Sequence, residues 1–189
     1  MMTRQRELSD TAAREEFMIE LLERMVRPCT PNRSKRKSTT DLLLSEGRFW
    51  VAQARPIGVS RAEAGMCFRN ATHLAWADPG GLTYCEGYAF PEDLDIPIEH
   101  AWCVDQSGHV VDNTWSSPES SVYFGVPLAL KYVAGVLAKK RTFGVVFDPA
   151  SGRELLSKPS SSWRAASQPL HRGDAHTQRT GAGVSATVW

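Results

Sequence analysis

The chain has few of the features that mark specialised classes of protein. No run of apolar residues approaches the length that a membrane-spanning helix requires, and the polar start of the chain, residues 1–6, does not resemble a secretory signal. The net charge of +1 provides no general attraction for a polyanion. We therefore expect a protein of the cytoplasm with no membrane contact, whose four cysteines are free thiols.

The cysteines also lack the spacing that is typical of zinc sites. Cys67, Cys85 and Cys103 together with a histidine would supply four ligands, but the chain contains no C-x-x-C and no H-x-x-x-H pattern. Cys85 and Cys103 lie in strand-like segments, where a lone cysteine is usually a small buried apolar residue. The sequence therefore predicts no metal and no other cofactor.

The composition is that of one globular domain with two weaker ends. Of the 189 residues, 42% are apolar and 23% are charged. We expect an N-terminal helix and basic loop over residues 1–38, a core over residues 39–156, and a disordered tail over residues 157–189, which is rich in Ser, Arg, Gly, His and Thr. The chain has no recognised nucleic-acid motif, so we interpret the basic run at residues 33–37 as a solvated loop.

Apolar periodicity and capping signals predict an α+β fold, in which helices pack on one side of a small antiparallel sheet. Ser60 and Glu63 stand in the capping-box pattern, which would start a helix that runs to Trp76. After Gly81 a period of two replaces the helical period. Predicted helices cover residues 10–25, 60–76 and 127–140, with a short one capped by Thr40 or Asp41 and ended by Gly47. Predicted strands cover residues 49–53, 82–90, 98–105, 109–115 and 142–147, and residues 123–126 form a short apolar segment.

One predicted hairpin has a register that the sequence itself specifies. The loop Gln-Ser-Gly before His109 has three residues, and such loops favour a left-handed residue, usually glycine, at their end, where Gly108 stands. This register places Trp102 opposite Asp112. Because one face of a strand repeats every second residue, His100 then lies diagonal to Asp112 on the same face, within reach of a side-chain hydrogen bond.

Three polar residues, Cys67, His100 and Asp112, follow one another in the order that suits a thiol active site. A thiolate attacks, an imidazole moves protons, and a carboxylate holds the imidazole in its useful tautomer. We prefer a chain break at Gly65 to a continuous helix from Ser60. Cys67 would then start a helix, whose positive end favours a thiolate and whose free N–H groups stabilise an oxyanion.

Two further residues are candidates for the surroundings of this site. Gln53 precedes Cys67 by 14 residues, and its side-chain amide is a candidate for a second oxyanion donor. Trp102 is a candidate for lining the acyl site, although a core aromatic is the simpler interpretation.

These motifs resemble the core of the transglutaminase-like superfamily, within the wider papain-like class. The likeness covers residues 65–115, and one departure is Asn113, where that family usually has proline. The resemblance implies a papain-like core in which Cys67, at a helix start, is the nucleophile, His100 is the base, and Asp112 orients the histidine. The matching motifs are Gly65-Met66-Cys67, Tyr84-Cys85-Glu86-Gly87-Tyr88, His100-Ala101-Trp102 and Asp112-Asn113-Thr114-Trp115.

The resemblance implies acyl-enzyme chemistry without specifying a substrate, because the family includes crosslinking acyltransferases, peptidases, deglycosylating amidases and non-catalytic relatives. We expect amide hydrolysis or acyl transfer on a peptide or protein amide. Hydrolysis is preferred, since the chain has no visible regulatory or calcium-binding module. The alternatives are a non-catalytic peptide-binding or partner-binding module on the same fold, and an adaptor that acts through the N-terminal helix and the tail.

Overall fold

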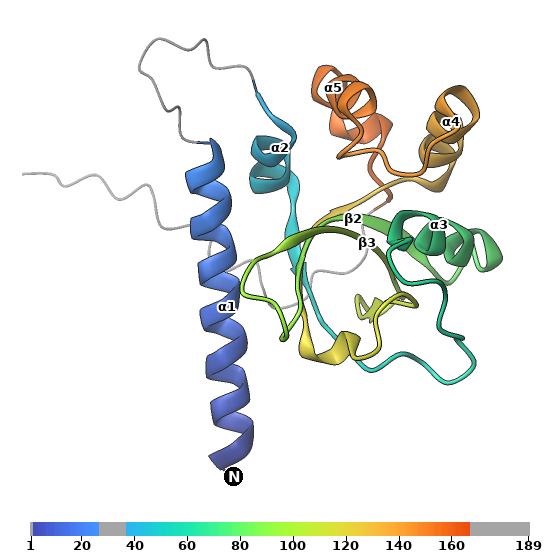
Figure 1. Cartoon of the computed structure of the whole chain (residues 1–189). Helices are drawn as coiled ribbons and strands as arrows, with labels where there is room; N and C mark the ends of the chain where they lie inside the picture. Colours follow the sequence, from blue (N-terminus) through green and yellow to red (C-terminus); the bar gives the residue numbers. More distant parts are fainter. Residues whose placement is uncertain (1, 27–36, 167–189) are drawn as a thin grey trace, which may run out of the picture.

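The computed structural model describes the backbone of residues 2–26 and 37–166, and the side chains of residues 11–26 and 37–166. This part of the chain has a mixed α+β fold, with five α-helices around a small antiparallel sheet of five strands (Figure 1). The predicted fold class is confirmed at this level. The elements are α1 (Met2–Val26), α2 (Thr39–Glu46), β1 (Arg48–Trp50), α3 (Cys67–Ala77), β2 (Thr83–Phe90), β3 (Ile98–Val104), β4 (Val110–Val111), β5 (Val122–Pro127), α4 (Leu130–Lys140) and α5 (Pro149–Ser157).

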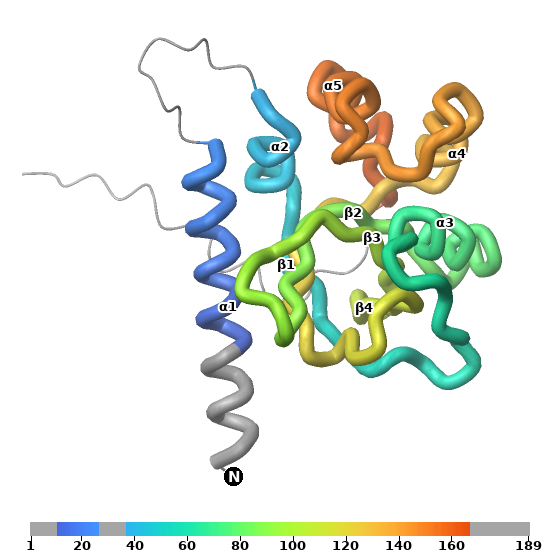
Figure 2. Tube along the Cα trace, in the orientation of Figure 1, coloured from blue at the N-terminus to red at the C-terminus, as the bar shows by residue number. Residues whose placement is uncertain are grey.

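The sheet curls so far that the residues next to its two edge strands, β1 and β4, contact each other (Figure 2). The strand order is β1-β5-β2-β3-β4, and every neighbouring pair is antiparallel. Val51, which directly follows β1, forms a bridge with His109 beside β4, and the Val110 N–H donates to the Val51 carbonyl at 2.8 Å. The sheet therefore has an enclosed inner face and an outer face that receives helices. The inner face is packed by Trp50, Cys85, Ala89, Trp102, Val104, Val110 and Tyr123.

Helices α2 to α5 pack against the outer face. Leu43 of α2, Ala71 of α3, Val133 of α4 and Leu155 of α5 belong to one buried cluster with residues of β2, β3 and β5. Helix α3 lies directly on β3, because the Cys103 thiol donates to the Ala71 carbonyl at 3.2 Å. Burial of each large apolar side chain stabilises the fold by about 1.5–3 kcal/mol. This packing sets the position of the first residue of α3 relative to β3.

Helix α1 runs along the side of the curled sheet (Figure 1). Met18 and Leu22 are fully buried, and the Arg14 guanidinium donates to the carbonyls of Ser120 and Phe90. Apolar periodicity predicts a helix start at residue 10, but the helix begins earlier, at Met2. In the part of the chain that the structure describes, no helix has the length and apolar character needed to cross a membrane.

Two predicted helix starts are wrong, and the preferred chain break is confirmed. Ser38, rather than Thr40 or Asp41, caps α2: its hydroxyl accepts the Asp41 N–H at 3.1 Å, and the Asp41 carboxylate accepts the Ser38 N–H at 2.7 Å. Residues 60–63 do not form the helix that their capping-box pattern predicts. Gly65 has a φ of 78°, a left-handed conformation that a helix does not contain, and α3 begins two residues later.

The predicted strand over residues 142–147 is also wrong. A buried side chain satisfies the backbone there: the Glu86 carboxylate accepts the Val145 N–H at 2.7 and 3.0 Å and the Val146 N–H at 2.8 Å. Burial raises the pKa of Glu86 to about 7, although these hydrogen bonds act in the opposite direction. The predicted helix from Pro127 starts later, because Pro127 is the last residue of β5.

The predicted start of the tail, at residue 157, is too early. A 3₁₀ turn follows α5 at Ser160–Ser162, and Trp163 is buried against the outer face of the sheet with 1% of its surface exposed. The Ala165 N–H donates to the Pro127 carbonyl at 3.2 Å. The core therefore extends past the predicted boundary. The rest of the predicted tail, residues 167–189, and most of the basic run lie outside the described residues.

Candidate active site

The three residues of the predicted triad come together in the structure. Cys67 is the first residue of α3, His100 lies in β3, and Asp112 directly follows β4. His100 Nε2 lies 2.8 Å from Asp112 Oδ2, and the Cys67 thiol is near enough to His100 to act as a hydrogen-bond partner. The side chains are buried, with exposed fractions of 8%, 1% and 1% in chain order.

The hairpin between β3 and β4 has the register that the sequence predicts. Val104 pairs with Val110, the Asp105 N–H donates to the His109 carbonyl at 2.9 Å, and Gly108 has a φ of 82°. Strand β4 is shorter than predicted because the chain turns at Asp112 instead of continuing the ladder. The diagonal contact between His100 and Asp112, which the register predicts, is confirmed.

The Asp112 carboxylate is held on both of its oxygens. Oδ1 accepts the Thr114 N–H at 2.7 Å and the Trp115 N–H at 3.4 Å. Oδ2 faces His100 and also accepts the Tyr123 hydroxyl at 3.0 Å. Burial on its own would raise the pKa of Asp112, but the hydrogen bond and charge of His100, together with the Thr114 and Tyr123 donors, lower it. Asp112 is therefore a fixed carboxylate whose orientation the fold determines.

His100 holds its proton more tightly than an ordinary histidine. Burial acts to lower its pKa, but hydrogen bonds to Asp112 and then to Cys67, with the negative charges of these partners, raise the pKa to about 9. Because Nε2 is engaged by Asp112, Nδ1 is the ring nitrogen left for the thiol. At neutral pH the ring is therefore an imidazolium between the Asp112 carboxylate and the Cys67 sulfur. A neighbouring imidazolium stabilises a thiolate.

Aromatic side chains enclose the His100 ring. Trp115 stacks on it with ring centroids 4.0 Å apart and an angle of 20° between the planes. Trp102 and Tyr123 lie farther off, at 6.3 and 6.2 Å. Trp102 is fully buried inside the curled sheet, which is the simpler of its two predicted roles. These rings keep water from the bond between His100 and Asp112, and a bond to a charged group is stronger in such surroundings.

The N-terminus of α3 supplies backbone donors next to the thiol. The N-cap residue, Met66, makes no side-chain cap, so the first N–H groups of α3 have no capping acceptor. The predicted second donor, Gln53, is half-buried between β1 and α3. Within the described residues, no hydrogen bond joins Gln53 to Cys67, His100 or Asp112. The geometry therefore favours the helix N-terminus over Gln53 as the source of oxyanion donors.

Two residues outside the predicted triad support the site. Tyr123 lies in a short apolar strand. A buried tyrosine hydroxyl generally needs a hydrogen-bond partner, and this need is the sequence signal that points to Tyr123. Asn70, in the first turn of α3, donates to the Glu63 carbonyl at 2.7 Å and to the Thr114 hydroxyl at 3.1 Å. It thereby joins the helix that carries Cys67 to the turn that carries Asp112.

Hydrogen bonds hold the segment between β1 and α3 against the turn that carries Asp112. The Ala62 N–H donates to the Asn113 carbonyl at 2.7 Å, and the Arg55 guanidinium donates to the Trp115 carbonyl at 3.0 Å. Arg61 Nε makes a weaker bond of 3.4 Å to the neighbouring Thr114 carbonyl. Together with the surrounding aromatic rings, this segment accounts for the low exposure of Cys67 and His100.

The cysteines do not gather as the zinc alternative requires. Cys85 packs on the inner face of the sheet and Cys103 on the outer face. Among the described residues, no group of three or more His, Cys, Asp or Glu side chains is placed to hold a metal ion. Comparison of the chain with protein-family models, curated proteins and solved structures found no significant match.

Proposed function

We propose that the protein is a cysteine hydrolase or acyltransferase of the transglutaminase-like type, which acts on an amide bond of a peptide or protein. Cys67 is the nucleophile, His100 the proton carrier, and Asp112 the group that orients and charges His100. The observation that carries the proposal is the placement of His100, which lies 2.8 Å from Asp112 on one side and near the Cys67 thiol, at a helix N-terminus, on the other.

The chemistry follows from these positions. The thiol proton of Cys67 resides on His100 in a thiolate–imidazolium pair, and the sulfur of Cys67 bonds to the substrate carbonyl carbon, whose oxygen takes up the negative charge. The N–H groups at the start of α3 stabilise that oxyanion. The carbon–nitrogen bond then breaks, and His100 gives its proton to the departing amine. An acyl group is left on the sulfur.

Water or a second amine completes the reaction by attacking this thioester. We propose water as the usual acceptor, so that the product is a carboxylic acid and the thiol is restored. The motif resemblance over residues 65–115 supports the acyl-enzyme chemistry. A reducing compartment such as the cytoplasm keeps Cys67 in the thiol form that the mechanism needs.

The test is the rate at which iodoacetamide alkylates Cys67 at about pH 6, well below the ordinary cysteine pKa of about 8.5. Peptide mass spectrometry reports the labelled residue, and labelling of the unfolded chain provides the reference rate. We expect faster labelling in the folded parent than in the reference, and loss of this advantage in His100→Ala. His73→Ala is the matched control, because it removes an exposed imidazole from α3 itself. Slow labelling that neither substitution changes would contradict the proposal.

One observation favours the alternative of a non-catalytic binding module. Cys67 and His100 are only 8% and 1% exposed, so a substrate reaches the thiol only if the segment over the site moves. In a binding module the buried triad would be a structural network, and Cys67→Ala would leave partner binding intact. In the enzyme, the same substitution abolishes turnover.

A further inference from the structure

Positive charge is concentrated at the end of the molecule formed by α4 and α5. Residues 128–165 contain seven Lys and Arg but only two Asp and Glu, which is a local net charge of +5 in a chain whose total is +1. The remaining residues are therefore acidic on balance. An asymmetry of this kind points to an anionic partner for the basic part. The cations are Lys131, Lys139, Lys140, Arg141, Arg153, Lys158 and Arg164, and the acids are Asp148 and Glu154.

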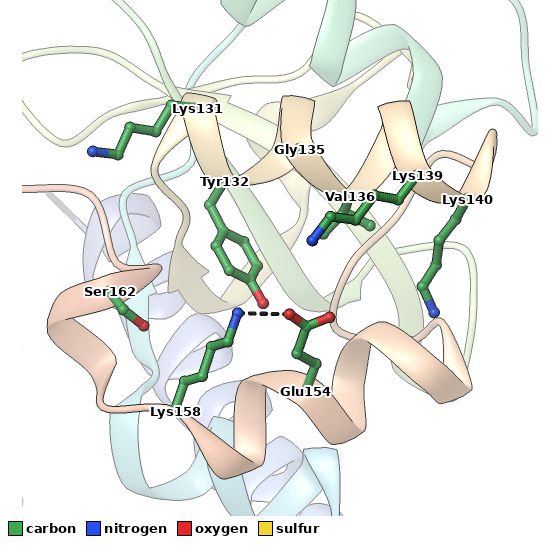
Figure 3. Close-up of a pocket in the computed structure, with 9 residues that line it drawn as sticks. All are labelled: Lys131, Tyr132, Gly135, Val136, Lys139, Lys140, Glu154, Lys158 and Ser162. Carbon is green, nitrogen blue, oxygen red and sulfur yellow. Dashed lines mark hydrogen bonds and ion pairs between the residues drawn. The ribbon is translucent and has the colours of Figure 1, made fainter.

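Within this region, α4 and α5 line an open groove of about 350 Å³. Figure 3 shows Lys139 and Tyr132 reaching into it from α4, and Lys158 and Glu154 meeting them from the other wall. Gly135 adds no side chain to the floor, and a Cβ there would meet nothing within 4 Å. The volume is at the lower end of the range for small-molecule sites in proteins.

The charges in the groove are not balanced from inside the protein. Lys158 pairs with Glu154 at 2.6 Å, and Lys140 is turned to Asp148 at 3.5 Å. Lys139 makes no ion pair with any described residue. The pKa of Glu154 is lowered first by Lys158 and further by Lys139 and Lys140, so the groove is electropositive even at its single carboxylate.

The groove also contains a hydrogen-bond donor that is not used. The Tyr132 hydroxyl is buried and has no hydrogen-bond partner among the described residues. Burial raises the pKa of Tyr132, so the hydroxyl remains a neutral donor near neutral pH. A buried hydroxyl without a hydrogen-bond partner destabilises the fold. An oxygen-rich ligand in the groove would remove that loss.

We propose that this groove is a binding site for a small phosphate-bearing ligand, held by Lys139, Lys158 and the Tyr132 hydroxyl. A phosphate group offers several strong acceptor oxygens and more than one negative charge, which suits compact ammonium groups and one neutral donor. The small volume of the groove favours a small molecule over a long polyanion, which needs an extended basic track instead. This site goes beyond the proposed acyl chemistry, because none of its residues belongs to the Cys67 site.

The experiment is isothermal titration calorimetry of the full chain with pyrophosphate at low salt, compared with a single-stranded oligonucleotide. We expect saturable binding of one pyrophosphate per chain in the micromolar to millimolar range, and about tenfold weaker binding in both Tyr132→Phe and Lys139→Gln. Arg24→Gln is the matched control, since Arg24 is an exposed cation on α1, away from the groove. Thermal unfolding shows whether each variant is folded as the parent is.

The outcomes separate the possibilities. One-site binding that both groove variants weaken and the control does not supports the proposal. Absence of saturable binding, or equal weakening in Arg24→Gln, would overturn it in favour of an unspecific basic surface. Tighter binding of the oligonucleotide with a steep dependence on salt would overturn it in favour of a nucleic-acid surface. Since the readout is binding, none of these results depends on whether Cys67 is catalytic.

Discussion

Replacing Asp112 with asparagine removes the charge beside His100 and keeps most of the shape. The new side chain still offers an acceptor to the Thr114 N–H, which Asp112 binds at 2.7 Å. A neutral amide, however, replaces the carboxylate oxygen that lies 2.8 Å from His100 Nε2. Burial, which on its own lowers the pKa of a histidine, then has less opposition. We expect the pKa of His100 to fall from about 9 to its ordinary value of 6.5 or below.

The expected size of the effect follows from the two pKa values. A fall from about 9 to 6.5 corresponds to about 3 kcal/mol of interaction between protonated His100 and its partners. In the parent, this stabilisation is complete below pH 6.5 and is lost as the pH rises through about 9, because the raised pKa means that the folded state holds the proton longer. We expect Asp112→Asn to lose about 3 kcal/mol more at about pH 6 than at about pH 10.

Two measurements report this change. NMR follows the ring resonances of His100 across the pH range, with His100→Ala identifying them, and urea unfolding gives the free energy of unfolding at the two pH values. Asp105→Asn is the matched control. Asp105 lies in the same hairpin and accepts the N–H groups of Ser107 and His109 at 2.9 Å, but it is about one-third exposed and does not act on the pKa of His100.

Two results would refute this account of the site. A His100 midpoint that stays near 9 in Asp112→Asn would mean that the carboxylate is not what holds the proton on the ring. A pH-independent loss of stability, equal in size to that of Asp105→Asn, would mean that Asp112 acts only as a turn residue. Either result would also weaken the proposed mechanism, which needs a charged partner for His100.

Two further predictions concern the scaffold. In Glu86→Gln, the free energy of unfolding should fall less between pH 4.5 and about 7 than it does in the parent, because the parent's folded state keeps the Glu86 proton longer than the unfolded chain does. Urea unfolding across that range measures the fall, and an unchanged slope would show that another group causes it. Gly125→Ala should lower the free energy of unfolding by about 2 kcal/mol or more, because its Cβ would lie 2.3 Å from the Glu86 carbonyl oxygen and 2.8 Å from the Trp102 ring. Gly135→Ala, with open space around it, is the control and should be neutral or stabilising by about 0.5–1 kcal/mol.

The hairpin was predictable because the information that specifies it is local. A three-residue loop ending in Gly108 sets which residues of the two strands face one another, and the period of two in a strand does the rest. The contact between His100 and Asp112 needs no other part of the molecule for its register. For the same reason the break at Gly65 was predictable, since glycine readily adopts the positive φ found there.

Local signals failed where a distant group offered the backbone a better partner. Residues 142–147 have the apolar character of a strand, but the carboxylate of Glu86, from a strand about sixty positions earlier in the chain, binds their N–H groups. The capping-box pattern at residues 60–63 did not start a helix, because the Ala62 N–H binds the Asn113 carbonyl. The polar neighbours of Trp163 predict a tail, whereas its own burial depends on packing against the sheet.

The order and the local setting of the triad follow from the sequence alone: a thiol after a glycine break, and a histidine and a carboxylate on one face of a hairpin. Tertiary packing is what puts α3 on β3, so that the thiol lies near His100, and the curl of the sheet brings the Tyr123 hydroxyl to Asp112 at 3.0 Å. Hairpin register arises from short-range backbone geometry. The contacts of Cys67 and Tyr123 arise instead from packing between segments that are far apart along the chain.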